Sequence, residues 1–192
     1  MKITDEITLD KLSENLRNLP SDFVILVVSP SEIYEKTNAK ILKLLCNEEK
    51  ISGIYITFNQ SCETLFELLT GAGVDTSKLF FIDMVTKNVS GKTERTKNCL
   101  FIPSPKEISD LGVAIDESIR MSGENKEFLF VDSVSALLLY NSMGTARKFE
   151  HFLTIRMRLG SLKGILMSLN SGTEKEIVPF LAQFCDKIIK IK

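Results

Sequence analysis

The chain has 192 residues, of which 44% are apolar and 26% are charged, and its formal net charge is −1. This length can bury enough surface for one globular domain, residues 1–192, to be stable without a disulfide or a metal ion. The near-zero charge, with no basic stripe, argues against nucleic acid as a partner. The sequence also lacks an apolar run of about 20 residues, so no membrane span is expected.

The beginning of the chain and its cysteines predict a cytoplasmic protein. Residues 1–6 are polar and acidic, which is not the pattern of a signal peptide. The cysteines are Cys46, Cys62, Cys99 and Cys185; none forms a CxxC pair, and the chain has one histidine. The usual zinc-binding spacings are therefore excluded, and no metal site is expected. Reduced thiols in the core, in a reducing compartment, are the interpretation that fits.

Short apolar runs recur along the chain and predict the strands of one sheet. They are nearly continuously apolar, which is typical of strands buried on both faces of a parallel sheet. The runs cover residues 23–28, 53–58, 79–85, 99–102, 127–132, 164–169 and 186–191. Amphipathic stretches separate most of them, so right-handed βαβ crossovers are expected. The sequence therefore predicts an α/β fold of three layers, with a mainly parallel, twisted sheet and helices on both faces.

The first 20 residues are predicted to form an N-terminal helical segment in front of a core that covers residues 21–192. Pro20 ends this segment before the first strand. The residues that fall on roughly one face of the helix are Leu9, Leu12, Leu16 and Leu19. Further helices are expected over residues 62–70, 105–121 and 145–159, and Ser61 is placed to cap the first of these.

Three segments together resemble the RecA/KaiC-like P-loop ATPases. The first, residues 23–45, is a buried strand, a short loop and a helix. The second, residues 53–85, is a strand, a polar pair, a helix and another strand. The third, residues 127–140, is similar to a Walker B strand that ends in Asp-Ser, and its strongest part, Phe128–Leu138, reads FLFVDSVSALL. The resemblance covers roughly residues 20–191 and implies a RecA-like P-loop core.

The phosphate loop of that family departs from its pattern in this chain. A Walker A loop reads GxxxxGK[ST], so that backbone N–H groups surround the phosphates, Lys contacts them and Ser/Thr holds Mg²⁺. If Lys36 and Thr37 occupy the last two positions, the first glycine becomes Pro30 and the last becomes Glu35. Proline offers no N–H, and a carboxylate repels phosphate. The alternative is that Lys36 and Thr37 simply begin a surface helix.

The catalytic positions implied by the resemblance are also altered. Where the family carries a catalytic glutamate after the second strand, this chain has Asn59 and Gln60, which cannot accept a proton from water. Both residues have the alternative role of capping the next helix. Asp132 and Ser133 are retained, and the family's aspartate at this position supports Mg²⁺ through water. A structural role, in which Asp132 hydrogen-bonds Lys36 or Thr37, is the alternative.

Gly91-Lys92-Thr93 also looks like the end of a phosphate loop. No helix-length segment follows it before Cys99, so we interpret it as a polar loop.

The resemblance therefore implies an inactive ATPase homologue that acts as a protein-interaction or regulatory module. Degenerate relatives of this kind are associated with signal transduction, and the partner expected is another protein. The alternative is a divergent nucleotide-binding protein or slow ATPase that holds ATP and Mg²⁺ with Lys36, Thr37 and Asp132. Hexameric members carry a basic hairpin after the last core strand. The sequence here stops at Lys192, so a monomer or dimer is expected.

Overall fold

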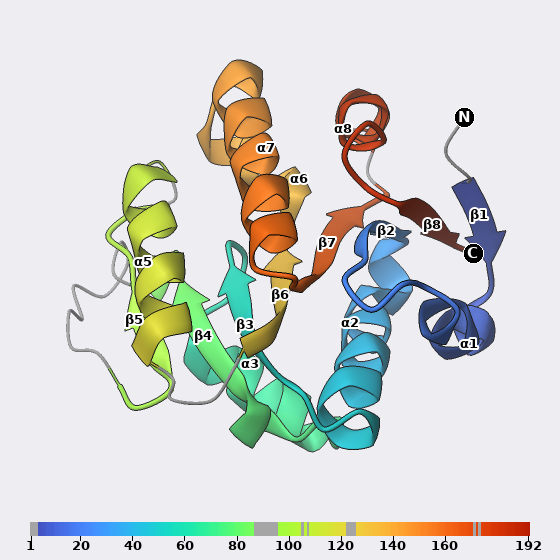
Figure 1. Ribbon diagram of the computed structural model, residues 1–192, viewed down its shortest axis with the longest axis horizontal. Coiled ribbons are helices and arrows are strands. Elements are labelled where there is room, and N and C mark those ends of the chain that lie inside the picture. Colours follow the sequence, from blue (N-terminus) through green and yellow to red (C-terminus); the bar gives the residue numbers. More distant parts are fainter. Residues whose placement is uncertain are drawn as a thin grey trace.

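The structure is a computed structural model that describes residues 4–86, 96–104, 106, 108–121, 126–170, 172 and 174–192. Eight strands form one sheet in the order β1-β8-β2-β7-β6-β3-β4-β5 (Figure 1), and every pair of neighbours is parallel. The strands are β1 (Thr4–Ile7), β2 (Val24–Ser29), β3 (Ser52–Thr57), β4 (Leu79–Asp83), β5 (Cys99–Phe101), β6 (Lys126–Asp132), β7 (Lys163–Leu169) and β8 (Lys187–Ile191).

Helices cover both faces of the sheet, which confirms the predicted three-layer α/β architecture (Figure 1). One face carries α1 (Leu12–Arg17), α2 (Tyr34–Leu42) and α3 (Cys62–Gly71). The other carries α5 (Ile108–Met121), α6 (Val134–Tyr140), α7 (Met143–Leu159) and α8 (Glu174–Leu181). None of the helices within the described ranges is long and apolar enough to cross a membrane.

The central strands are buried along their whole length, and this is why the sequence runs were apolar without alternation. Every residue of β2, β3 and β4 is buried. Side chains that alternate along these strands enter two separate apolar clusters, one under each helical layer. Each predicted run corresponds to an observed strand, with ends that differ by at most two residues.

The N-terminal segment was predicted incorrectly in part. Where a helical segment was expected, the described residues form β1, then a 3-10 turn at Leu9–Lys11 and the short helix α1. The reason is the free edge of β8, with which β1 pairs in parallel, while Asp5 and Glu6 form ion pairs with Lys187 and Lys192. The four leucines still face the core, with Leu12 and Leu16 buried and Leu9 and Leu19 packed beside them.

Ser61 caps α3 as predicted, since its hydroxyl accepts a hydrogen bond from the Thr64 amide. The expected polar loop at Gly91-Lys92-Thr93 lies outside the described residues.

Candidate functional site

The parallel strands bring their carboxyl ends to one edge of the sheet, and polar residues stand at several of these ends. Ser29, Thr57, Asp83 and Asp132 are the last residues of β2, β3, β4 and β6, and all four are at most 4% exposed. The strand register places Thr57 opposite both Asp83 and Asp132. In open α/β sheets ligands bind at this edge, so a functional site is expected here.

The connection from β2 to α2 lies where the resemblance places a phosphate loop. It is a 3-10 turn over Ser31–Ile33 that leads directly into α2 at Tyr34. The Ile33 amide donates to the carbonyl of Pro30 at 3.3 Å and is therefore used inside the turn. The Tyr34 amide is likewise used, since it donates to the carbonyl of Ser31. These two amides are therefore not available to an anion, whereas an anion-binding loop directs successive N–H groups at one point.

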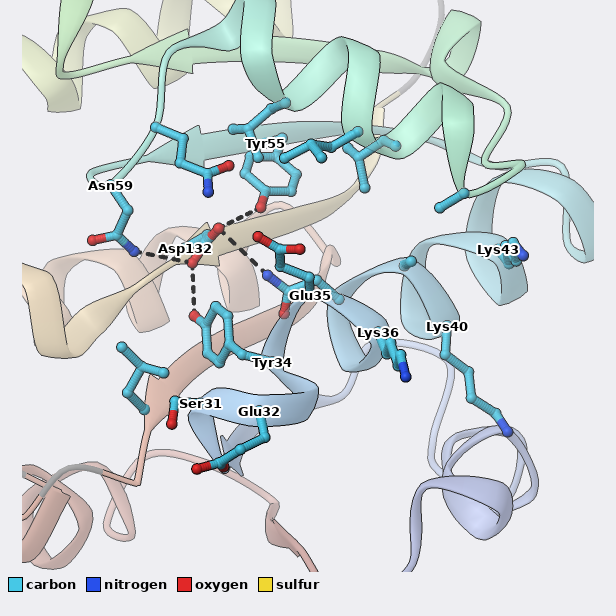
Figure 2. A pocket seen from close by; sticks show the side chains of 18 residues that line it. Ser31, Glu32, Tyr34, Glu35, Lys36, Lys40, Lys43, Tyr55, Asn59 and Asp132 are labelled. Carbon is cyan, nitrogen blue, oxygen red and sulfur yellow. Dashed lines mark hydrogen bonds between the residues drawn. The ribbon is translucent and has the colours of Figure 1, made fainter.

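Lys36 is exposed on α2, and its side chain does not face Asp132. Figure 2 shows its ammonium group directed away from Asp132, toward the side of the helix where Lys40 lies. Glu35, by contrast, extends toward the carboxylate of Asp132 (Figure 2). The structure therefore separates the Lys36 ammonium from the Asp132 carboxylate.

Thr37 is completely buried and is engaged within its own helix. Its Oγ1 donates to the carbonyl of Ile33 at 2.9 Å and lies 3.0 Å from the Oγ of Ser29. These bonds hold the start of α2 against the end of β2. The sequence-based alternative that Asp132 hydrogen-bonds Lys36 or Thr37 was wrong, because other side chains occupy the carboxylate.

Asp132 accepts four hydrogen bonds from four side chains (Figure 2). Tyr34 donates to Oδ1 at 2.6 Å, and Asn59 donates to the same oxygen at 3.3 Å. Tyr55 donates to Oδ2 at 2.5 Å, and Asn38 donates to it at 3.4 Å. An ionised carboxylate has about four lone-pair positions, so these donors occupy all of them.

Burial raises the pKa of Asp132, and the hydrogen bonds from Tyr34, Tyr55 and Asn59 oppose this shift. The charge of Glu35 raises the pKa further. The pKa values of Tyr34 and Tyr55 are also raised, first by burial and then by the charge of Asp132. Both phenols therefore keep their protons and act as donors to the carboxylate at neutral pH.

Packing fixes Tyr55 in place, since its ring stacks on Phe130 of β6 with a centroid distance of 4.9 Å and contacts Phe81 of β4 at 5.6 Å. Its hydroxyl is thus held beside Asp132 by the two strands that flank β3.

Asn59 and Ser133 complete the network. The Asn59 amide donates to Asp132 and to the Ser133 hydroxyl, the latter at 3.4 Å. Ser133 caps α6 by accepting from the Ala136 amide, and the Asp132–Ser133 peptide bond is cis. The capping role expected for Asn59 and Gln60 was wrong, because Ser61 caps α3 and Asn59 turns back to the carboxylate.

A cavity of about 680 Å³ lies over this network, between α2 and α3. Apolar residues of α3 and of the residue that follows it form one wall: Leu65, Leu68, Leu69 and Ala72. Lys36, Lys40 and Lys43 line the α2 side, together with Glu32 and Glu35. Its floor includes Tyr34, Asn38, Tyr55 and Asp132.

The floor of the cavity offers hydrogen-bond acceptors. The Oδ1 of Asn38 is buried, and no donor among the described residues reaches it. The hydroxyls of Tyr34 and Tyr55 use their O–H groups as donors to Asp132, so toward the cavity they can only accept. A phosphate group needs donors, whereas this floor suits a group that carries N–H or O–H.

The sequence assigned Asp132 and Ser133 to the site and placed Asn59 where the family has its catalytic base, but Tyr34, Asn38 and Tyr55 were missed. Two signals were present. Tyr34 and Asn38 are four residues apart and so share one face of a helix. Tyr55 places a hydroxyl in an otherwise apolar strand, and a buried hydroxyl needs a partner.

Comparison with known proteins supports the fold and leaves the activity open. No family model matches the chain, and no curated protein does. Among solved structures, a KaiC-like protein from the hyperthermophilic archaeon Pyrococcus horikoshii OT3 is similar, with a TM-score of 0.60 and 14% sequence identity. The match covers 90% of this chain and 72% of that one. The chain thus has a RecA/KaiC-like α/β fold.

Proposed function

We propose that this chain is a non-catalytic RecA/KaiC-like domain that acts as a regulatory or protein-interaction module. The observation that carries the proposal is the complete occupation of the Asp132 carboxylate by four side-chain donors. A water bound to Mg²⁺ would need one of these lone pairs, and a phosphate would meet acceptors and Glu35. Pro30 and Glu35 at the positions of the loop glycines point the same way, as does Asn59 at the position of the catalytic base.

The competing function is nucleotide binding through Lys36, Thr37 and Asp132. It requires Lys36 to turn toward Asp132 and Thr37 to give up its bonds to Ile33 and Ser29. It also requires the Tyr34 hydroxyl to leave the carboxylate. The proposal and this alternative therefore differ in a measurable quantity, the affinity for Mg·ATP.

The first experiment is the melting temperature of the chain with and without millimolar Mg·ATP, Mg·ADP and GTP. A ligand at 100 times its dissociation constant adds about 2.7 kcal/mol, which raises the melting temperature of a domain of this size by roughly 5–10 °C. We expect no shift with any of the three. A shift that Lys36→Ala removes and Lys40→Ala retains would overturn the proposal, since both lysines line the same cavity.

The regulatory role also predicts a monomer or dimer in solution, with a cytoplasmic protein as the partner. Light scattering of the purified chain measures this state directly. A stable ring of six subunits would contradict the proposal, because it is the assembly of the catalytic relatives.

A second candidate, a small non-phosphate ligand in the cavity, is favoured by the Oδ1 of Asn38, which no donor in the described part of the chain reaches. Because this oxygen is shielded from solvent, the Asn38 side chain would have to turn before an amino or amide group of the ligand could bind it. The apolar body of the ligand would lie against Leu65 and Leu69. A thermal-shift panel of primary amines, amino-acid amides and nucleosides tests it. Binding that Asn38→Leu removes supports this function, and failure of the whole panel counts against it.

A further inference from the structure

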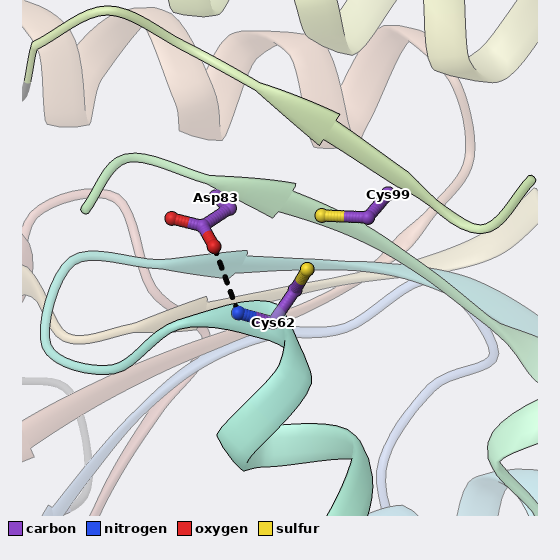
Figure 3. Close-up of side chains that lie close together, drawn as sticks. All are labelled: Cys62, Asp83 and Cys99. Carbon is purple, nitrogen blue, oxygen red and sulfur yellow. Dashed lines mark hydrogen bonds between the residues drawn. The ribbon is translucent and has the colours of Figure 1, made fainter. Parts of the chain in front are cut away.

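Cys62, Asp83 and Cys99 come together on the α3 side of the sheet (Figure 3). Cys62 is the first residue of α3, Asp83 the last of β4 and Cys99 the first of β5. Their two sulfur atoms and one carboxylate oxygen all lie within 4.8 Å of one another. Among the described residues, this is the one group of three or more histidine, cysteine, aspartate or glutamate side chains whose ligand atoms are close enough together to hold a metal ion.

The fold holds the three side chains in place before anything binds. Cys99 pairs with Phe81 across the β4–β5 ladder. The Cys62 amide donates to Oδ2 of Asp83 at 2.8 Å, so the start of α3 is tied directly to the end of β4. Asp83 and Cys99 are buried, while Cys62 is half-buried and connects the group to solvent. Preorganised ligands with one accessible side are what a metal site requires.

The distances suit a thiophilic ion. Zinc binds cysteine sulfur at about 2.3 Å and carboxylate oxygen at roughly 2.0–2.2 Å, so two sulfurs on one ion lie about 3.8 Å apart in a tetrahedral site. Atoms already within 4.8 Å need only small side-chain rotations to reach this arrangement. We propose that Cys62, Asp83 and Cys99 form a binding site for a soft divalent cation of the Zn²⁺ type.

Asp83 already accepts four hydrogen bonds, and their donors decide whether it can also coordinate. The amides of Val85 and Thr86 donate to Oδ1 at 2.7 and 2.8 Å. Oδ2 accepts from the Cys62 amide and from the Thr86 hydroxyl, the latter at 2.6 Å. The hydroxyl can rotate away, which frees one lone pair on Oδ2, while three backbone N–H groups keep the carboxylate oriented. Ligand carboxylates in metal sites are commonly held in this way.

Three protein ligands leave a fourth position of a tetrahedral ion open toward the exposed side of Cys62. An ion bound here would join the start of α3 to the β4–β5 edge of the sheet. The segment that leads into α3 contains Asn59, which donates to Asp132. The ion would therefore also restrain the segment that borders the cavity.

The spacing along the chain did not reveal this group. Cys62, Asp83 and Cys99 are separated by about 16 to 21 residues and include no CxxC pair, so the sequence excluded only the common zinc motifs. The group depends on β5 pairing with β4, which places Cys99 beside the start of α3.

The test uses the full chain, reduced and freed of metal with a chelator, and titrated with ZnCl₂ against a chromophoric chelator. We expect one Zn²⁺ per chain, with an affinity that rises with pH because the thiols must lose their protons. Cys62→Ser and Cys99→Ser should each weaken binding by about 100-fold or more, and Asp83→Asn by about 10–100-fold. Cys185→Ala, on the opposite face of the sheet, should leave the affinity unchanged.

A second readout guards against variants that fail to fold. With Co²⁺ as the probe, the wild-type chain should show a thiolate-to-metal charge-transfer band, and Cys62→Ser, at the half-buried position, should lose much of it while keeping its circular dichroism spectrum. Wild-type chain that binds neither ion at micromolar concentration would overturn the proposal. So would binding that survives Cys62→Ser and Cys99→Ser. These results are independent of the nucleotide measurement, because no residue of this group lines the cavity.

Discussion

Asp83 and Asp132 end two strands that flank β3, and the two carboxylates are satisfied by different kinds of donor. Both are buried, both stand opposite Thr57 in the sheet, and both accept four hydrogen bonds. For Asp83, three of the donors are backbone amides, of Cys62, Val85 and Thr86. For Asp132, all four donors are side chains.

The difference indicates what each carboxylate does. Backbone amides are present whatever the side chains are, so Asp83 fixes the path of the chain after β4 and at the start of α3. Side-chain donors exist only because the sequence supplies them at four separate positions. The Asp132 network therefore depends on the particular side chains that this sequence supplies.

The largest effect is expected for Asp132→Ala, which leaves three buried donors, Tyr34, Asn38 and Tyr55, without this acceptor. Removing one partner of a buried charged network costs about 4 kcal/mol, so the melting temperature should fall by roughly 10 °C. Thermal and urea unfolding followed by circular dichroism measure it. Asp132→Asn, which keeps one acceptor, should lose less. A loss below about 1 kcal/mol for the alanine variant would show that water replaces the carboxylate freely.

A third buried carboxylate, Glu150 of α7, sharpens the comparison because no donor among the described residues reaches its Oε1. Burial raises its pKa to about 8, against a smaller opposing effect of Arg147. The folded chain then keeps a proton that the unfolded chain releases above about pH 4.5. Stability should therefore fall as the pH rises from about 5 to 8, by about 3 kcal/mol from this residue.

Glu150→Gln isolates that contribution, since it cannot ionise. The difference in unfolding free energy between pH 5 and pH 8 should be smaller in this variant than in the wild type by about 3 kcal/mol. Asp132 titrates equally in both chains, so its contribution cancels. Equal pH dependence in the two chains would contradict a buried, protonated Glu150.

The sequence predicted the sheet well because the central strands are buried on both faces. Strands of this kind have continuous apolar runs, which can be recognised in the sequence. It failed at β1, where the segment Thr4–Ile7 is short and half-exposed. Its place depends on β8, at the far end of the chain. A partner that distant cannot be inferred from local periodicity.

The candidate site was predicted only in part for a similar reason. Asp132 and Asn59 follow strands, and their position at the sheet edge could be inferred from parallel packing. Tyr55 reaches Asp132 because β3 and β6 are neighbours in the sheet. These two strands are not consecutive along the chain. Nothing in the sequence alone fixes that order. Cys62 and Cys99 were missed because their meeting depends on the β4–β5 pairing.

A smaller effect is expected for Tyr55→Phe, which removes one of the four donors to Asp132 and keeps the ring between Phe81 and Phe130. A hydrogen bond to a charged group is worth about 2 kcal/mol, and the hydroxyl is fully buried. Tyr34→Phe should cost less, since Tyr34 is 8% exposed and water from the cavity can take its place. Urea unfolding of both variants gives the order, and the reverse order would contradict it.

The smallest effect is expected for Thr86→Val, which removes the hydroxyl from Asp83 and leaves its backbone amides in place. Because Thr86 is half-buried, water can replace its hydroxyl, and the three backbone amides still hold the carboxylate, so the loss should be about 1 kcal/mol or less. Set beside Tyr55→Phe, it compares the loss of one donor from each carboxylate. If Thr86→Val lowers the free energy of unfolding as much as Tyr55→Phe does, the backbone amides do not compensate for the loss of a side-chain donor at Asp83. The proposed difference between Asp83, which holds the backbone after β4, and Asp132, which holds the side chains at the floor of the cavity, would then be wrong.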